Sequence, residues 1–210
     1  KNAGAFTGQY FGKYELLGVI GKGGMGEVYK GFGDDTVVAV KVLPQDLARD
    51  PNLVKRFERE ATMLSRLKHP NIVKLYDSGV TDTGAHYLAM EYIDGQELGQ
   101  LIKEQAVSYE TICEWLTVIA SALDYIHKQG LVHRDIKPSN IMLRLMDDNE
   151  TWQPILMDFG IAHIDFAGTQ LTGTGTIGTI DYMAPEQIMA ATEVDYRADI
   201  YSLGVVLYEM

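Results

Sequence analysis

The sequence predicts an α+β fold in two lobes: a lobe of antiparallel strands with one main helix over residues 1–92, and a mainly helical lobe over residues 93–210. Residues 14–20 and 36–43 are rich in Val, Ile, Leu and Tyr with glycines between them, which is typical of strands. Residues 112–126 carry apolar side chains at steps of three and four, which is typical of an amphipathic helix. The pattern changes after Asp94-Gly95, and the predicted boundary therefore falls just before this pair.

Composition limits the function classes that the chain can belong to. With 210 residues, 46% of them hydrophobic and 22% charged, it can build one large domain or two small lobes with a buried core. The formal net charge of -11 repels phosphate backbones and argues against general nucleic-acid binding. The single cysteine, Cys113, excludes an internal disulfide and a multi-cysteine zinc site and favours the cytoplasm. No apolar run is long enough to span a bilayer, so any membrane anchor is expected outside this chain.

The first motif of the strand-rich lobe is glycine-rich. Gly21, Gly23 and Gly26 form the pattern G-x-G-x-x-G, which lets backbone N–H groups approach a phosphate. Residues 27–30 continue as a strand, so the glycines lie at a hairpin tip and do not open a helix as in a dinucleotide-binding fold. Taken alone, this pattern is equally compatible with an ordinary glycine-rich turn.

The next strand and helix bring two charged residues into apolar surroundings. In Val38-Ala39-Val40-Lys41, Ala39 and Lys41 share a face, where a small residue and an ammonium can contact a base and phosphates. Asp50-Pro51 starts a helix, whose apolar face includes Glu60. An inward acid needs a partner, and Lys41 can supply it, although a snorkelling lysine is the plainer alternative. Strands at 72–75 and 86–92 complete this lobe.

The second lobe carries the motif that decides the interpretation. After the helix over 112–126, which ends at Lys128 and Gly130, come His133-Arg134-Asp135-Ile136-Lys137-Pro138-Ser139-Asn140 and then Asp158-Phe159-Gly160. Asp135 can accept a hydroxyl proton, and Lys137 can neutralise charge on a transferring phosphoryl group. Asn140 and Asp158 supply the oxygen ligands that suit Mg²⁺. Between them, residues 146–153 are polar and acidic and predict an extended hairpin turn.

These motifs together resemble the protein kinase family, and in particular the bacterial, eukaryotic-like (Hanks-type) serine/threonine kinases. The resemblance implies the two-lobed protein kinase fold with its last helices missing from this chain. It also implies an enzyme that transfers a phosphoryl group from ATP to Ser/Thr hydroxyls of proteins in signalling, with Mg²⁺ as the metal and Mn²⁺ as an alternative.

The resemblance also implies a role for each motif residue. The catalytic residues are Asp135 as base, Lys137, Lys41 and Glu60, and the metal ligands are Asn140 and Asp158. The nucleotide is bound by Gly21, Lys22, Gly23, Gly24, Met25, Gly26 and Val28 in the glycine-rich segment, by Ala39, Lys41 and Met142, by the gatekeeper Met90, and by the hinge from Glu91 to Ile93. Leu64, Leu75, His133 and Phe159 resemble the residues that stack between the lobes of active kinases.

The segment after Gly160 resembles an activation segment that ends at Ala184-Pro185-Glu186. The resemblance also places Thr179 in the loop that receives the substrate, and together with Lys137 this residue favours Ser/Thr over Tyr. A phosphate on a loop threonine can bind Arg134 and order the loop, and Thr172, Thr174 and Thr176 are the regulatory candidates, the first two being preferred. We therefore expect autophosphorylation, with self-association for transfer in trans; the alternative is a flexible polar loop.

The end of the chain and two competing functions complete the expectations. Residues 200–210 are apolar almost all round, so the helix there should expose an apolar patch or be covered by later helices, one of which normally pairs an arginine with Glu186. A nucleotide-binding pseudokinase scaffold is disfavoured because every catalytic position is filled. A small-molecule kinase of related fold is disfavoured by Thr179 and the Ala184-Pro185-Glu186 segment.

Overall fold

The computed structural model describes residues 3–23, 26–104, 106–148, 150–159, 177–189 and 194–210, with side chains from residue 180 onward in the fifth range. The chain forms two compact units: Lys1–Leu67 with Val73–Ile93, and Lys68–Ile72 with Asp94–Met210. The first is built mainly of antiparallel strands and the second mainly of helices, which confirms the predicted α+β class. No helix within the described ranges has the length and apolar character that crossing a bilayer demands.

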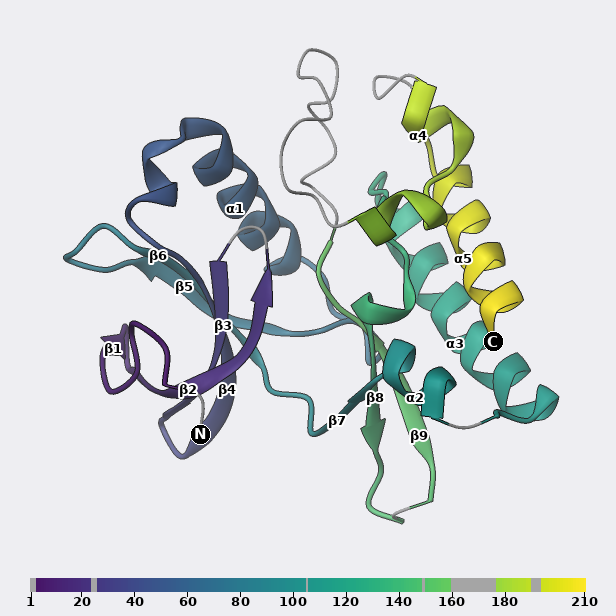
Figure 1. The fold of residues 1–210 in the computed structure, drawn as a ribbon, viewed down its shortest axis with the longest axis horizontal. Helices are drawn as coiled ribbons and strands as arrows, with labels where there is room; N and C mark the ends of the chain where they lie inside the picture. The colour runs from purple at the N-terminus through teal and green to yellow at the C-terminus, as the bar shows by residue number, and fades with distance from the viewer. Residues whose placement is uncertain (1–2, 24–25, 105, 149, 160–176, 190–193) are drawn as a thin grey trace. The chain divides into compact units, whose positions relative to one another are not determined.

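The first unit contains a six-stranded antiparallel sheet with the order β1-β2-β3-β4-β6-β5 (Figure 1). Its strands are β1 (Tyr10–Phe11), β2 (Tyr14–Gly23), β3 (Gly26–Gly33), β4 (Thr36–Leu43), β5 (Leu75–Val80) and β6 (His86–Glu91). The strands β2 to β4 follow one another as hairpins, so the glycine-rich segment joins two paired strands.

Alternation along β4 divides the first unit into two faces. Val38, Val40 and Val42 point to one face and are fully buried there. This face is covered by an aromatic cluster to which the N-terminal segment contributes, since the Phe6 ring packs edge-on against Phe11 at 5.3 Å. The buried members of this core are Phe11, Tyr14, Leu16, Tyr29, Val38, Val40, Val42, Ala85, Tyr87 and Ala89. Ala39 and Lys41 consequently point to the opposite face.

The helix α1 (Pro51–Leu64) follows a short 3-10 turn at Leu47–Arg49 and lies beside β5 and β6 (Figure 1). As the sequence predicts, Asp50 caps it: the carboxylate accepts the backbone N–H of Asn52 at 2.9 Å, and Pro51 is the first helical residue. Its buried residues are Phe57, Glu60 and Leu64.

The prediction of a strand at residues 72–75 was wrong. Ile72 forms an isolated parallel bridge to Leu156, outside any strand, and the strand β5 begins at Leu75 and continues to Val80. Residues 75–80 alternate between half-buried and exposed, as an edge strand does. The apolar run at residues 72–75 therefore belongs mostly to a connection between elements, whereas the sequence of β5 itself is only weakly apolar.

The second unit combines a small sheet with helices. Its elements are β7 (Gly95–Glu97), α2 (Leu98–Glu104), α3 (Tyr109–His127), β8 (Ile141–Leu145), β9 (Trp152–Leu156), α4 (Pro185–Met189) and α5 (Arg197–Glu209), with 3-10 turns at Pro138–Asn140 and Ile177–Tyr182. The helices α3 and α5 lie side by side (Figure 1). Ser108 caps α3, although this cap was not predicted from the sequence. As predicted, the helix ends at Lys128 and Gly130, and Gly130 has a φ of 72°.

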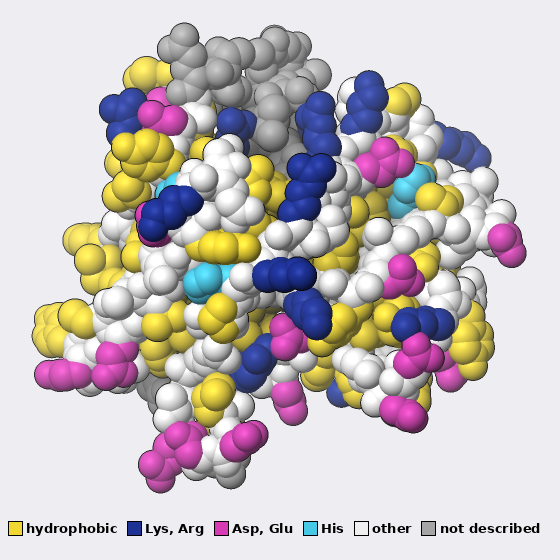
Figure 2. Space-filling model, turned by 180° about the vertical axis from the view of Figure 1, so that it is seen from behind, with side chains coloured by type: hydrophobic (Ala, Val, Ile, Leu, Met, Phe, Trp, Pro, Cys, Tyr) yellow, Lys and Arg dark blue, Asp and Glu magenta, His cyan; other side chains and the backbone are white. Residues whose placement is uncertain are grey.

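The strands β8 and β9 form the predicted hairpin, whose turn covers residues 146–151 and is thus two residues shorter than expected. Asp148 shapes the turn because its carboxylate accepts the backbone N–H groups of Glu150 and Thr151 at 3.0 and 2.8 Å. Figure 2 shows acidic side chains gathered at this tip, where Asp147, Asp148 and Glu150 are exposed.

The helix α5 buries one side and exposes the other. Ala198, Asp199, Ser202 and Val206 are buried. Ile200, Leu207 and Tyr208 are 56%, 51% and 93% exposed, which confirms the apolar surface predicted for this helix. Glu186 is also exposed.

Candidate active site

In the first unit, the structure brings Lys41 and Glu60 together. The ammonium of Lys41 donates to both carboxylate oxygens of Glu60, at 2.9 and 3.0 Å. Only 14% of the Lys41 side chain and 5% of the Glu60 side chain are exposed. Because an unpaired charge is costly at such burial, each group holds the other in place, and the ammonium is fixed on the face that Ala39 shares.

In the glycine-rich segment, β2 ends at Gly23 opposite Gly26, where β3 begins. Gly24 and Met25, with their predicted contacts, lie outside the described residues. Lys22 and Glu27 lie opposite each other across the pair and form an ion pair at 2.8 Å. The phenol of Tyr29 donates to Glu27 and accepts the backbone N–H of Phe6 at 3.2 Å. These bonds from Lys22 and Tyr29 lower the pKa of the Glu27 carboxyl, while burial raises the pKa of Tyr29.

Strand register places other predicted nucleotide-contacting residues. Val28 lies opposite Lys41, and Ala39 lies opposite Met90 in the neighbouring strand β6. Ala39 and Met90 are 5% and 3% exposed, and Ile93, which closes this unit, is also buried. Glu91 donates its backbone N–H to the carbonyl of Lys74 at 2.8 Å.

In the second unit, three predicted residues of the catalytic loop meet. The Asp135 carboxylate lies 2.9 Å from the ammonium of Lys137. The amide nitrogen of Asn140 donates to the same carboxylate oxygen and to the Asp135 carbonyl, both at 2.8 Å. Pro138 starts the 3-10 turn Pro138–Asn140, which contains Asn140 and follows Lys137 directly. Asp135 is therefore oriented from two sides, which is what a proton acceptor that must meet one hydroxyl requires.

Asn140 and Asp158 also approach each other. The Asn140 amide nitrogen lies 3.5 Å from the Asp158 carbonyl, and Met157 donates its backbone N–H to the Asn140 carbonyl at 2.8 Å. Because the amide nitrogen is committed to Asp135, the side-chain oxygen is the atom of Asn140 that can bind a metal. Asp158 adopts a left-handed backbone with φ 34°, a conformation that non-glycine residues rarely take outside functional sites.

His133 is a buried structural partner of this loop. Its Nε2 lies 3.0 Å from the Met157 carbonyl, which can only accept, so Nε2 carries the proton. Its Nδ1 accepts the backbone N–H of Asp135 at 3.3 Å. Burial lowers the pKa of His133, which agrees with a neutral ring. The ring also packs on Phe159 at 4.5 Å, so two of the four residues predicted to stack are in contact within this unit.

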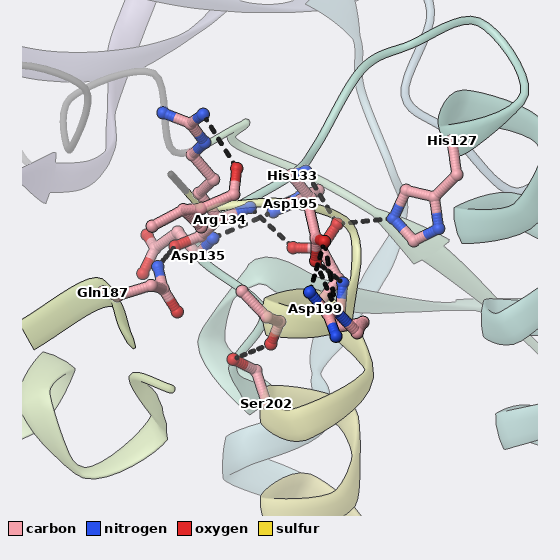
Figure 3. A network of polar contacts seen from close by, with 11 residues as sticks. His127, His133, Arg134, Asp135, Gln187, Asp195, Asp199 and Ser202 are labelled. Atoms are coloured by element: carbon pink, nitrogen blue, oxygen red, sulfur yellow. Dashed lines mark hydrogen bonds and ion pairs between the residues drawn. The ribbon is translucent and has the colours of Figure 1, made fainter. Parts of the chain in front are cut away.

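Sequence reasoning did not foresee how Asp199 of α5 anchors the loop. Its fully buried carboxylate accepts the backbone N–H groups of His133 and Arg134 at 2.8 and 2.7 Å, and His127 Nε2 lies 2.7 Å from it (Figure 3). Arg134 needs this support because its φ is 67°. The one signal in the sequence was an acid, Asp199, within an apolar helix, which indicates that the acid needs a partner. The sequence did not indicate that this partner is His127, because the two residues are 72 positions apart.

Of the remaining predicted residues, some have described positions and others lie outside the described residues. Met142 lies in β8 opposite Ile155 and is half-buried. The Arg134 guanidinium donates to the carbonyl of Val194 at 3.3 Å. Thr172, Thr174 and Thr176 lie outside the described residues, as does the side chain of Thr179, whose backbone belongs to the 3-10 turn Ile177–Tyr182.

Comparison with known families decides what this arrangement is. The model of the protein kinase domain matches residues 14–210. The chain belongs to the protein kinase family. Within it, the kinase domain is similar to bacterial proteins whose names describe serine/threonine kinases. It is 42% identical over 214 residues to a probable serine/threonine-protein kinase PknB of Bifidobacterium longum, covering 95% of this chain and 30% of that protein. It is also 42% identical over 206 residues to the serine/threonine-protein kinase PknB of Mycobacterium tuberculosis, covering 94% of this chain and 32% of that protein.

Solved structures lead to the same family. The kinase domain of PknI from Mycobacterium tuberculosis matches with a TM-score of 0.74 and 31% identity, over 96% of this chain and 73% of that chain. The predicted kinase fold and membership of the bacterial Hanks-type serine/threonine kinases are thus confirmed. The chain spans about a third of the length of the curated relatives described above.

Proposed function

We propose that this kinase domain transfers the terminal phosphoryl group of ATP to serine and threonine hydroxyls of proteins. Protein kinases as a family use ATP and a divalent metal, and the kinase relatives act on proteins. The observation that carries the proposal is the held carboxylate of Asp135, with Lys137 at 2.9 Å and Asn140 at 2.8 Å. In the proposed reaction, Asp135 accepts the proton of the attacking hydroxyl while Lys137 neutralises charge on the transferring group.

The donor set of the second unit fits a hard divalent cation. Asn140 has its amide nitrogen engaged and its oxygen available, and Asp158 carries a carboxylate nearby in the fold. Such oxygen ligands suit Mg²⁺, with Mn²⁺ as the alternative, and the ion would neutralise phosphate charge. In this proposal Asn140 and Asp158 hold the metal, and His133 keeps the loop in register beside Asp135.

The first unit supplies the proposed nucleotide-binding groups except Met142, which lies in β8 of the second unit. The ammonium of Lys41, fixed by Glu60, would bind the α- and β-phosphates, and backbone N–H groups of residues 21–26 would cover them. Val28, Ala39 and Met142 would contact the base, with Met90 as gatekeeper and residues 91–93 as hinge. The ion pair between Lys22 and Glu27 joins the two strands of this hairpin, which supports a fixed position of its backbone N–H groups for binding the phosphates.

The test is transfer of radiolabelled phosphate from ATP to a generic protein substrate by the full-length protein. We expect label on serine and threonine with wild-type protein and none above background with Asp135→Asn or Lys41→Met. Asp124→Asn is the matched control, since the side chain of this aspartate is 62% exposed and pairs with Lys128 at the end of the same helix. Label that survives Asp135→Asn at the wild-type rate would refute the assignment of the base.

Regulation by autophosphorylation is part of the proposal. A phosphate on Thr172, Thr174 or Thr176 would bind Arg134, and Thr179 would contact the substrate backbone. Mass spectrometry after incubation with Mg-ATP should find phosphate on this loop, at a rate that rises with protein concentration because two copies associate for transfer in trans. An unmodified loop would contradict this part.

The single cysteine supports action in a reducing compartment, for which we propose the cytoplasm.

A further inference from the structure

Gln187 of the short helix α4 contacts the loop that contains Asp135, although no motif assigns it a role. Its amide nitrogen donates to the carbonyl of Arg134 at 2.9 Å, and its amide oxygen accepts the backbone N–H of Ala184 at 3.0 Å. Figure 3 shows Gln187 projecting from α4 toward the segment Arg134–Asp135. The donor and acceptor are 53 positions apart in the chain.

The orientation of the Gln187 amide is fixed by its two partners. Ala184 presents a backbone N–H, which can only donate, so the side-chain oxygen must face it. Arg134 presents a carbonyl, which can only accept, so the nitrogen must face that group. A glutamate of the same length can therefore keep the first bond but cannot make the second.

The carbonyl of Arg134 belongs to the same planar peptide unit as the N–H of Asp135. That N–H donates to Nδ1 of His133 at 3.3 Å, so the peptide directly before the catalytic base is held at both ends, by His133 and by Gln187. The preceding peptide is held by Asp199 through the N–H of Arg134. A rotation of either plane would turn the Asp135 side chain away from its bonds with Lys137 and Asn140.

We propose that Gln187 is a positioning residue that orients the peptide of Asp135 through the Arg134 carbonyl. This inference rests on the proposed function, in which Asp135 is the base. It makes α4, which follows the substrate-binding turn Ile177–Tyr182, a second support of the catalytic loop besides α5.

Two variants separate positioning from simple capping of α4. Gln187→Met has similar volume and makes neither bond, whereas Gln187→Glu can still accept from Ala184 and cannot donate to Arg134. Positioning predicts that both variants lower kcat by about tenfold to about 100-fold, the range expected when a reacting group is misplaced by a fraction of an ångström to an ångström. The KM for ATP should stay unchanged, because the nucleotide contacts other residues.

The measurement is steady-state phosphorylation by the full-length protein with ATP and a protein substrate varied separately. Gln129→Glu is the matched control, since Gln129 makes its side-chain bond to Tyr125 at the exposed end of α3, and it should keep wild-type kcat. A Gln187→Glu protein with wild-type kcat, or a raised KM for ATP with kcat unchanged, would overturn the inference. Wild-type protein that transfers no phosphate would instead refute the proposed function, so the two failures are distinguishable.

Discussion

Replacing Asp199 by asparagine tests the anchoring of the catalytic loop most directly. The carboxylate is fully buried and accepts one bond through Oδ1, from Arg134, and two through Oδ2, from His133 and His127. Asparagine keeps the shape but replaces one oxygen by an NH₂ group. In either orientation of the amide, the NH₂ faces a backbone N–H, of residue 133 or of residue 134, and that buried donor loses its acceptor.

The magnitude follows from these contacts. A buried donor left unsatisfied costs about 1–3 kcal/mol, and each bond that remains loses about 1 kcal/mol because its acceptor is no longer charged. Relief of the desolvation of the buried carboxylate offsets part of this loss. We therefore expect the free energy of unfolding to fall by about 3 kcal/mol, which corresponds to a lowering of Tm by about 6–12 °C for a domain of this size.

Thermal unfolding monitored by tryptophan fluorescence is the assay, because both tryptophans of this chain, Trp115 and Trp152, lie in the second unit with Asp199. The matched control is Asp195→Asn, whose side chain is 44% exposed and pairs with Arg197, and it should cost less than about 1 kcal/mol. If Asp199→Asn and Asp195→Asn lower Tm equally, the reasoning that Asp199 anchors the loop is refuted.

Two further predictions concern Glu60 and pH. Glu60→Gln should lower kcat/KM for ATP by about tenfold to about 100-fold, because a neutral amide holds the Lys41 ammonium less firmly, whereas Glu58→Gln on the exposed side of α1 should leave it unchanged in steady-state assays. Burial lowers the pKa of His133 and of His69 below the ordinary 6.5. Below pH 6.5 the unfolded chain therefore binds protons that the folded chain does not bind. The free energy of unfolding should consequently fall as the pH drops below 6.5. Denaturant unfolding at about pH 7.5 and about pH 5.5 checks this, and equal stability at both would contradict it.

Local signals accounted for much of the fold. Asp50 and Pro51 predicted the start of α1, and the glycine at position 130 predicted the end of α3, because caps depend on side chains and backbone dihedrals within a few residues. The edge strand β5 was misplaced because its residues lack a strong apolar pattern. Pairing with β6 along a whole edge decided its position, and no window of sequence contains that information.

The pairing of Lys41 with Glu60 could be predicted because each was a charged residue on an otherwise apolar face. Gln187 and His127 gave no such signal, since polar residues on short or half-exposed helices are common. The partner of Gln187, the Arg134 carbonyl, is 53 positions away, and the partner of His127, Asp199, is 72 positions away. The second pair meets only because α3 packs against α5.

The sequence by itself identified the family: the order and spacing of Asp135, Lys137, Asn140 and Asp158 resemble the motifs of protein kinases, and the model of that domain matches residues 14–210. Tertiary structure alone decided how Asp135 is held. A strained loop at Arg134 cannot be stable on its own, so its backbone groups must be satisfied by side chains from distant helices, and those contacts exist only after the second unit has packed.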